Sequence, residues 1–152
     1  MCWLSRIFSG TVERPSPSNI VPEGNIRHDI TANLILVSVG GLNIPFAKPP
    51  KVWIPPIPDS NSMDPAFDHG HNNILIAGAD IFEQIKMVDF LKAGDIAVYE
   101  VETGRPIIHR IVKIGQDSQG RYFRFQGDNN TVKDPYKVRD ENIQWLCIGT
   151  IF

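Results

Sequence analysis

Two serines stand two residues apart in the stretch DSNSMDP, and they are the first candidates for chemistry in this 152-residue sequence. A serine hydroxyl is a weak nucleophile at neutral pH and requires a base within hydrogen-bond reach. A histidine base in turn requires a third group that holds its tautomer. If Ser62 is a nucleophile, the chain must therefore supply an imidazole and an acidic partner. The competing interpretation is a simple turn, since Ser, Asn, Asp and Pro are common turn residues.

His109 is the candidate base, because it interrupts the otherwise apolar stretch PIIHRIVKI, where it shares a strand face with Ile107 and Ile111. An imidazole on an apolar face is costly unless it is paired. Taken alone, such a residue is more often a hydrogen-bonded core histidine than a base. Asp128 and Asp134, in QGDNNTVKDPY, are the acidic candidates. GDNN followed by DP is also ordinary turn chemistry, so both interpretations stay open here.

The other polar residues indicate no metal, cofactor or nucleic acid. His69 and His71 flank a glycine in FDHGHNN, but no third ligand stands at a useful spacing, and we therefore reject a metal site. The net charge is −2 and the basic residues are scattered along the chain. This excludes the electrostatic footprint of a nucleic-acid binder. Cys2 and Cys147 form no CxxC pair and no metal spacing.

The elements that position these residues are predicted to be mostly β. Apolar or alternating patterns predict strands over residues 30–39, 72–78, 94–101, 106–114, 121–127 and 145–152. Prolines from residue 45 to 58 predict an extended path and exclude a helix. Residues 1–25 are rich in Ser, Pro and Gly and are expected to form a loosely ordered arm, with residues 26–152 as a single domain.

One helix is predicted, over residues 80–92. Asp80 can serve as its N-cap, and Glu83 stands three residues later as in a capping box. Gly94 supplies a stop signal. Four apolar residues recur at helical spacings of three and four, namely Ile81, Ile85, Val88 and Leu91. The expected fold class is therefore α+β, with short antiparallel strands and one inserted helix.

The order of the polar segments is more specific than any one of them. The chain presents SNSMDP, GDIAVYE, IIHRIV, QGDNNTVKDPY and ENIQWLCIGTI in succession. This succession resembles the type I signal peptidase family of serine endopeptidases. Its members show an S-x-S-M-x-P box, a G-D-I-V-x-F-like strand, a base followed by Arg, and a G-D-N-N or G-D-N-R box. The resemblance covers about residues 55–152 and implies the β fold shared by signal peptidases and LexA-like proteins.

The resemblance implies a nucleophile and an oxyanion hole in the SMDP box. Ser62 takes the place of the nucleophile. Ser60 falls where the family often has a hydroxyl that forms the oxyanion hole together with the backbone N–H of the nucleophile. Met63 is suited to lining a pocket or packing beneath the turn, and as a competing interpretation it is simply a core residue.

The resemblance also implies a base and its orienting group. His109, ahead of Arg110, stands where bacterial members carry lysine and the archaeal and endoplasmic-reticulum branch carries histidine. In that branch an aspartate in or just after the GDNN box supports the histidine. The match falls on Asp134, with Asp128 as the alternative. An imidazole has a reference pKa of about 6.5 and is poised near neutral pH without the desolvation that a lysine base requires.

The implied activity is cleavage of a protein or peptide that binds as an extended strand, after small residues. Family members are anchored by a transmembrane helix, and no such segment is visible in this sequence. The expectations are therefore a cytoplasmic location by default and at most a peripheral association with a membrane.

Two other functions remain open. One is a LexA-like self-cleaving protease, although that group uses a Ser-Lys pair and an N-terminal DNA-binding domain. The other is a catalytically silent β module used for binding or assembly, because function depends on site geometry rather than on fold.

Overall fold

The computed structural model describes residues 23–29, 34–40, 44, 46–101 and 104–151. Its α-helix, 3-10 helix and strands have the following bounds: β1 Glu23–Asp29, β2 Leu34–Gly40, β3 Lys51–Trp53, β4 Asn72–Ala77, α1 Ile81–Phe90, β5 Ile96–Glu100, β6 Pro106–Asp117, β7 Gly120–Gln126, η1 Asp140–Asn142 and β8 Ile143–Ile151. The expected mostly β fold with one inserted helix is confirmed.

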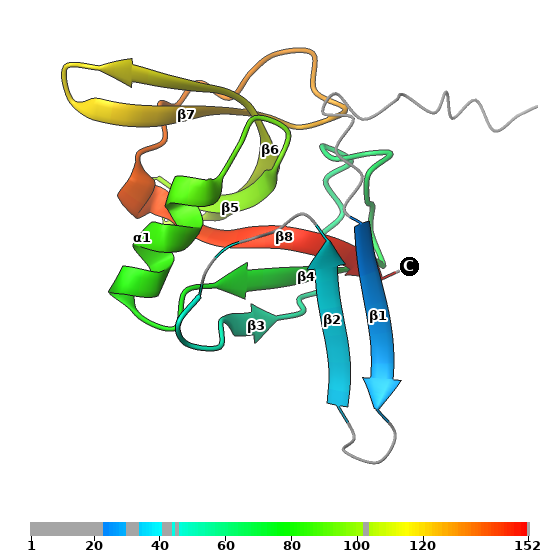
Figure 1. The fold of residues 1–152 in the computed structure, drawn as a ribbon. Coiled ribbons are helices and arrows are strands. Elements are labelled where there is room, and N and C mark those ends of the chain that lie inside the picture. Colours follow the sequence, from blue (N-terminus) through cyan, green and yellow to red (C-terminus); the bar gives the residue numbers. More distant parts are fainter. Residues whose placement is uncertain (1–22, 30–33, 41–43, 45, 102–103, 152) are drawn as a thin grey trace, which may run out of the picture.

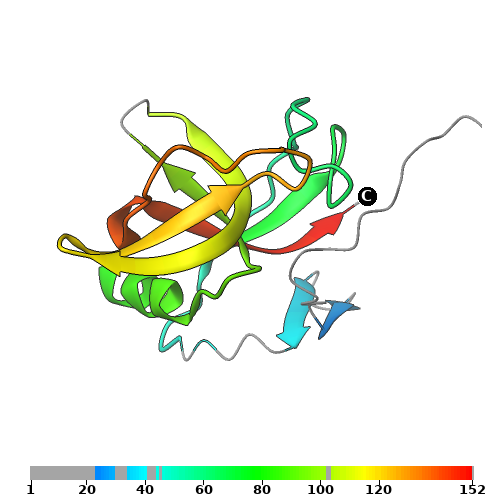
Figure 2. The ribbon, with the colours of Figure 1, turned by 90° about the horizontal axis from the view of Figure 1, so that it is seen from above.

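The strands form two antiparallel sheets. β1 and β2 pair with each other in a two-stranded hairpin, and the other strands form a six-stranded sheet in the order β3-β4-β8-β5-β6-β7 (Figure 1). Register shifts interrupt the pairing between β4 and β8, between β5 and β8, and between β6 and β7. Such irregularities bend a sheet and increase its twist. Seen from above, the long hairpin of β6 and β7 curves around the rest of the sheet (Figure 2).

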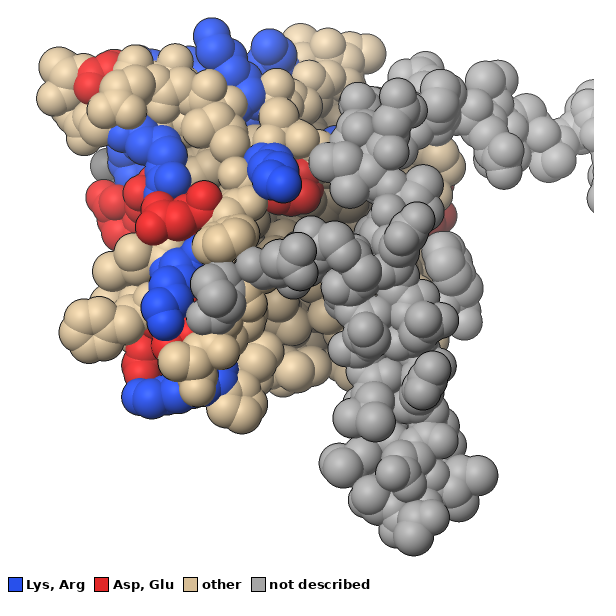
Figure 3. Space-filling view, in the orientation of Figure 1, with Lys and Arg blue, Asp and Glu red and all other residues tan. Residues whose placement is uncertain are grey.

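The main hydrophobic core lies between the sheet and α1. Met87 and Val88 of α1 pack in one cluster with aromatic and aliphatic residues of the sheet, among them Tyr99, Phe123 and Phe125. Surface ion pairs add to this contact: Arg121 of β7 binds Asp89 of α1 at 2.8 Å and Asp140 of η1 at 2.7 Å. On the face drawn in Figure 3, basic and acidic side chains lie close together rather than in separate patches.

The predicted strands agree with the sheet, with two additions. Residues 72–78, 94–101, 106–114, 121–127 and 145–152 overlap β4, β5, β6, β7 and β8, and residues 30–39 overlap β2. Residues 30–33 and 152 lie outside the described residues. β1 and β3 were not predicted. The expected arm lies mostly outside the described residues, and its boundary at residue 25 stays a prediction.

The predicted helix is confirmed, but its buried face differs from the one that its isoleucines suggest. The Asp80 side chain accepts hydrogen bonds from the backbone N–H groups of Phe82 and Glu83, as expected of an N-cap. Ile81 and Ile85 are 65% and 53% exposed, whereas Met87 and Val88 are buried. Helical spacing identifies the period of a helix, and several stripes along α1 satisfy it.

Glu83 also has a role other than the predicted capping box. It is only 3% exposed, and its carboxylate accepts from the backbone N–H of Ala47 at 3.0 Å and from Lys86 Nζ at 3.1 Å. The carboxylate thus connects α1 to the proline-rich segment before β3. Within the described part of the chain, no helix has the length and apolar character needed to cross a bilayer.

Gly78 is expected to be essential for the contact between the end of β4 and α1. A Cβ atom at this position would lie 2.1 Å from the backbone N of Gln84 and 2.5 Å from its Cα, and backbone atoms cannot easily move away. We expect Gly78→Ala to lower the free energy of unfolding by about 1–3 kcal/mol, as overpacking does. Chemical denaturation measures this. Gly149→Ala is the matched control, since its new Cβ would meet its nearest neighbour at 3.7 Å, and equal stability of the two variants would contradict the prediction.

Candidate active site

The imidazole of His109 lies between the hydroxyl of Ser62 and the carboxylate of Asp134. Its Nε2 is 3.1 Å from Ser62 Oγ, and its Nδ1 is 2.6 Å from Asp134 Oδ2. The side chains of His109 and Asp134 are 10% and 11% exposed, so the contact between them is largely shielded from water. The structure therefore brings together three residues that the sequence analysis singled out, from three separate segments of the chain.

Asp134 determines which ring nitrogen of His109 carries a proton. Burial raises the pKa of Asp134, but hydrogen bonds from His109 and Tyr99 outweigh burial and hold that pKa below its ordinary value. An ionised carboxylate only accepts hydrogen bonds, so His109 Nδ1–H donates to it. In a neutral imidazole this leaves Nε2 as the acceptor for the O–H of Ser62. The arrangement has the geometry of a serine nucleophile with an oriented base.

β5 and β6 place His109 on the core-facing side of the sheet. In the antiparallel pairing, His109 stands opposite Ala97, and Tyr99 stands opposite Ile107. Opposite residues of an antiparallel pair project to the same face, and residues two apart along one strand do so as well. His109 therefore lies diagonally beside Tyr99, at the border between the apolar core and the turn that carries Ser62.

Asp128 binds Arg110 rather than His109. Arg110 Nε donates to Asp128 Oδ1 at 2.7 Å, and Arg110 Nη2 donates to Oδ2 at 2.5 Å. Both side chains are 7% exposed, and Arg110 Nη1 also donates to the carbonyl of Gly94 at 2.8 Å. This bidentate pair fixes the GDNN turn to β6. Of the two aspartates considered in the sequence, Asp134 is the one that contacts the imidazole.

The GDNN turn also holds the segment that carries Ser62. The backbone N–H of Asn129 donates to the carbonyl of Ser62 at 3.0 Å, and Asn129 Nδ2 donates to the carbonyl of Asn61 at 3.0 Å. Asn61 has a φ of 54°, in the left-handed region that asparagine tolerates better than most residues. DSNSMDP is therefore a turn, as one interpretation of the sequence expected, and the GDNN turn fixes its position.

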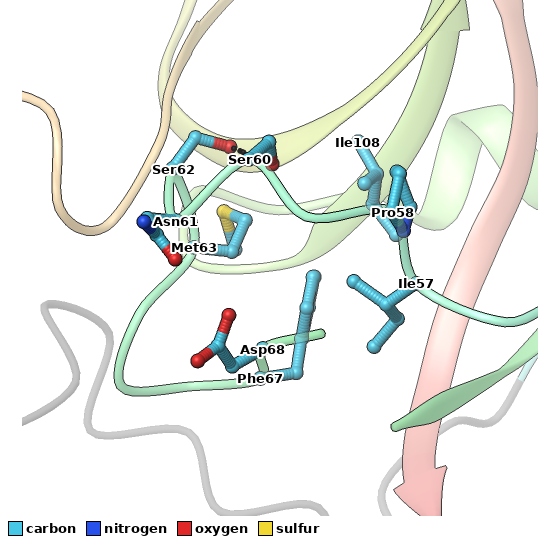
Figure 4. A pocket seen from close by; sticks show the side chains of 9 residues that line it. All are labelled: Ile57, Pro58, Ser60, Asn61, Ser62, Met63, Phe67, Asp68 and Ile108. Carbon is cyan, nitrogen blue, oxygen red and sulfur yellow. Dashed lines mark hydrogen bonds between the residues drawn. The ribbon is translucent and has the colours of Figure 1, made fainter. Parts of the chain in front are cut away.

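A small pocket lies beside Ser62, with a cavity volume of about 20 Å³. Figure 4 shows Ser60 and Ser62 close together beside it, with the apolar side chains of Met63 and Phe67 below them. Met63 is 2% exposed and packs with Ile57 and Phe67, so it both lines the pocket and belongs to a small core of its own. The hydroxyls of Ser60 and Ser62 are 3.3 Å apart.

Sequence reasoning missed Tyr99, whose hydroxyl donates to Asp134 Oδ2 at 2.8 Å. The alternation in GDIAVYE placed this residue in a strand, but no local signal pointed to a polar partner 35 residues away. The one available signal was the residue type, since a buried tyrosine hydroxyl usually has a hydrogen-bond partner.

Comparisons with known proteins find relatives among the subunits of signal peptidase complexes. No protein-family model matches the chain. The chain is 35% identical over 102 residues to a "Signal peptidase complex catalytic subunit SEC11" of Eremothecium gossypii, which covers 60% of this chain and 53% of the relative. It is 34% identical over 89 residues to a "Putative signal peptidase complex catalytic subunit SEC11B" of Homo sapiens, which covers 57% and 48%. A SEC11 subunit of Candida albicans is 37% identical over 76 residues, with 49% and 40% covered.

These matches confirm the resemblance seen in the sequence: over the matched residues, the chain is similar to SEC11 catalytic subunits of signal peptidase complexes. The chain spans about half the length of the curated relatives that it matches. The relatives give no support to the expected cytoplasmic location.

Gly127→Ala is expected to separate the Ser62 hydroxyl from the His109 imidazole. A Cβ atom there would lie 2.4 Å from the carbonyl oxygen of Ser62 and 2.9 Å from His109 Nε2. Since a misplacement of 1 Å can reduce a reaction on the order of 100-fold, we expect a loss of that size in the rate at which a fluorophosphonate probe labels Ser62. Gly149→Ala is the control. A folded Gly127→Ala variant that labels at the rate of the parent chain would contradict the prediction.

Proposed function

We propose that this chain is a serine endopeptidase of the signal peptidase type, with Ser62 as nucleophile, His109 as general base and Asp134 as the residue that orients the base. The observation that supports this best is the row of hydrogen bonds from Ser62 through His109 to Asp134, at 3.1 and 2.6 Å. The similarity to catalytic subunits of a signal peptidase complex supports peptidase chemistry independently of that geometry.

In the proposed reaction, Ser62 Oγ attacks the carbonyl carbon of a peptide bond while its proton passes to His109 Nε2. The new C–O bond moves the carbonyl π electrons onto oxygen and gives a tetrahedral oxyanion. His109 then gives the proton to the leaving amine as the C–N bond breaks, and an acyl ester remains on Ser62. A water molecule, deprotonated by the same imidazole, hydrolyses this ester. The ionised Asp134 stabilises the imidazolium that forms in each half of the reaction.

The oxyanion requires donors that are in place before the charge develops. We propose that the backbone N–H of Ser62 and the hydroxyl of Ser60 supply them. The Ser60 hydroxyl is 3.3 Å from Ser62 Oγ, so a carbonyl attacked by Ser62 would lie within its reach.

The substrate in this proposal is an extended peptide with a small residue at the cleavage point. The pocket beside Ser62 has a cavity volume of about 20 Å³, close to the space that one water molecule needs, and Ile57, Met63 and Phe67 line it. A methyl group or a hydrogen atom suits such a pocket. By analogy with the named relatives, which are subunits of a signal peptidase complex, we also infer protein partners.

The two alternatives have less support. A LexA-like self-cleaving protease uses lysine as its base, and here an imidazole lies 3.1 Å from the serine hydroxyl. A silent module gives no reason for a buried imidazole and a buried carboxylate to align on one serine, because buried polar groups are costly unless they are paired in a defined geometry.

Substitutions in the proposed triad are expected to abolish reaction with a fluorophosphonate probe and with a panel of peptides that carry small residues at alternate positions. Ser62→Ala removes the nucleophile and should end labelling. Asp134→Asn leaves the imidazole without an anionic acceptor and should slow labelling on the order of 10⁴-fold. Asp89→Asn, at a site that is 56% exposed, is the matched control. Labelling that survives Ser62→Ala, or a parent chain that shows neither labelling nor cleavage at any pH, would overturn the proposal.

Ser60→Ala is expected to lower kcat for peptide cleavage by about 100-fold or more, because it removes one preorganised donor to the oxyanion. KM should change far less, since the donor acts on a charge that exists only in the transition state. Steady-state kinetics with a cleaved peptide from the same panel measure both constants. Ser118→Ala, in the turn between β6 and β7, is the control. An unchanged kcat in the Ser60→Ala variant would show that Ser60 is not part of the oxyanion hole.

A further inference from the structure

The hydroxyl of Tyr99 reaches the same carboxylate oxygen as the imidazole of His109. Tyr99 Oη donates to Asp134 Oδ2 over 2.8 Å, and His109 Nδ1 lies 2.6 Å from that oxygen. The side chain of Tyr99 is fully buried, and its ring packs on that of Phe125 with centroids 4.5 Å apart. Packing in the core therefore fixes the orientation of the ring, and this orientation places the hydroxyl at Asp134 Oδ2.

Tyr99 acts at that point as a donor. Burial raises the pKa of Tyr99 far above its ordinary value, and the hydrogen bond to Asp134 raises it further. The hydroxyl therefore keeps its proton over the whole neutral range of pH. Asp134 is ionised in the same range, since its pKa lies below the ordinary value of an aspartate. The contact is thus a hydrogen bond to a charged group, which is stronger than one between neutral groups.

We propose that Tyr99 is a positioning residue: its hydroxyl holds the Asp134 carboxylate in the orientation that accepts the Nδ1–H of His109, and it thereby sets the reactivity of Ser62. This inference rests on the proposed function and extends the row of hydrogen bonds by one member, from Ser62 through His109 and Asp134 to the core.

Packing alone does not account for the hydroxyl. A phenylalanine would make the same ring contact with Phe125. The extra oxygen of Tyr99 is buried, and a buried hydroxyl without a partner would be destabilising. Its partner here is the carboxylate of the proposed triad, so the hydroxyl contributes a hydrogen bond to the site in addition to the packing of the ring.

Several charged or titratable groups face this contact from the neighbouring elements. His109 approaches from β6 and Tyr99 from β5. From β7, Arg124 Nη1 lies 3.5 Å from the backbone carbonyl oxygen of Asp134 and donates to the carbonyls of Pro135 and Tyr136 at 3.0 and 3.1 Å. The guanidinium thus holds the backbone of the loop, and the hydroxyl of Tyr99 acts on the carboxylate itself.

The test compares Tyr99→Phe with Tyr122→Phe in the full chain. Both variants remove one hydroxyl and keep the ring, and Tyr122 lies on β7 with Lys137 over its ring, as a contact of the surface rather than of the site. The first readout is the titration of the Asp134 carboxyl carbon by NMR. Tyr99→Phe should raise its midpoint, because a hydrogen bond that favours the charged form is lost. The second readout is the rate of fluorophosphonate labelling, which should fall about tenfold. Tyr122→Phe should change neither.

The outcomes separate this inference from the proposed function. A raised Asp134 midpoint together with slower labelling supports the role of Tyr99, provided that melting curves show both variants folded. An unchanged midpoint, or labelling at the parent rate, overturns that role and leaves the Ser62, His109 and Asp134 assignment intact. A parent chain that shows neither labelling nor peptide cleavage overturns the proposed function itself, and the role of Tyr99 in reactivity with it.

Discussion

The arrangement of the site depends on the close approach of two turns, one that carries Gly127 and one that carries Ser62. A single added carbon at Gly127 would lie 2.4 Å from the Ser62 carbonyl oxygen and 2.9 Å from His109 Nε2. The missing Cβ therefore allows the turn at Gly127 to approach both the backbone of Ser62 and the imidazole of His109. Asn129 keeps the two turns together through its hydrogen bond of 3.0 Å to the Ser62 carbonyl. The need for glycine here comes from this close approach rather than from an unusual backbone angle.

Two aspartates of one loop bind different partners. Asp128 neutralises a buried arginine and fixes the start of the loop to β6, while Asp134, six residues later (134 − 128 = 6), faces the imidazole. A buried guanidinium requires its own counter-charge, because an unpaired buried charge is strongly destabilising. If one carboxylate served both the guanidinium and the imidazole, its charge would be drawn toward the arginine and the imidazole would lose its acceptor. Separate partners allow the Arg110–Asp128 ion pair to anchor the loop while Asp134 accepts the hydrogen bond from the imidazole.

The sequence alone singled out residues whose chemistry only a few side-chain types can provide. It did not identify contacts that depend on tertiary packing. Ser62, His109 and Asp134 could be proposed because few residue types can serve as nucleophile, base and orienting acid, and because the boxes that carry them stand in a specific order. The buried face of α1 could be predicted only in part: Val88 and Leu91 of the predicted stripe are buried, whereas Ile81 and Ile85 are exposed and Met87, outside that stripe, is buried. The hydrogen-bond partner of Glu83 could not be predicted either, because it is the backbone N–H of Ala47, 36 residues earlier in the chain. Contacts of this kind depend on tertiary structure that no local pattern encodes.

Tyr99 shows how the core and the site depend on each other. Its ring belongs to the cluster that holds Met87 of α1 against the sheet, and its hydroxyl lies at the carboxylate of Asp134. A hydrogen-bond donor on an exposed loop would move with the loop, whereas a donor on a fully buried ring is held in place by the surrounding core. Preorganised hydrogen bonds contribute most when they need no rearrangement as charge develops. A tyrosine in the core therefore lets the same packing that stabilises the fold also hold the Asp134 carboxylate beside the His109 imidazole, and a disturbance of α1 would reach the site through that cluster.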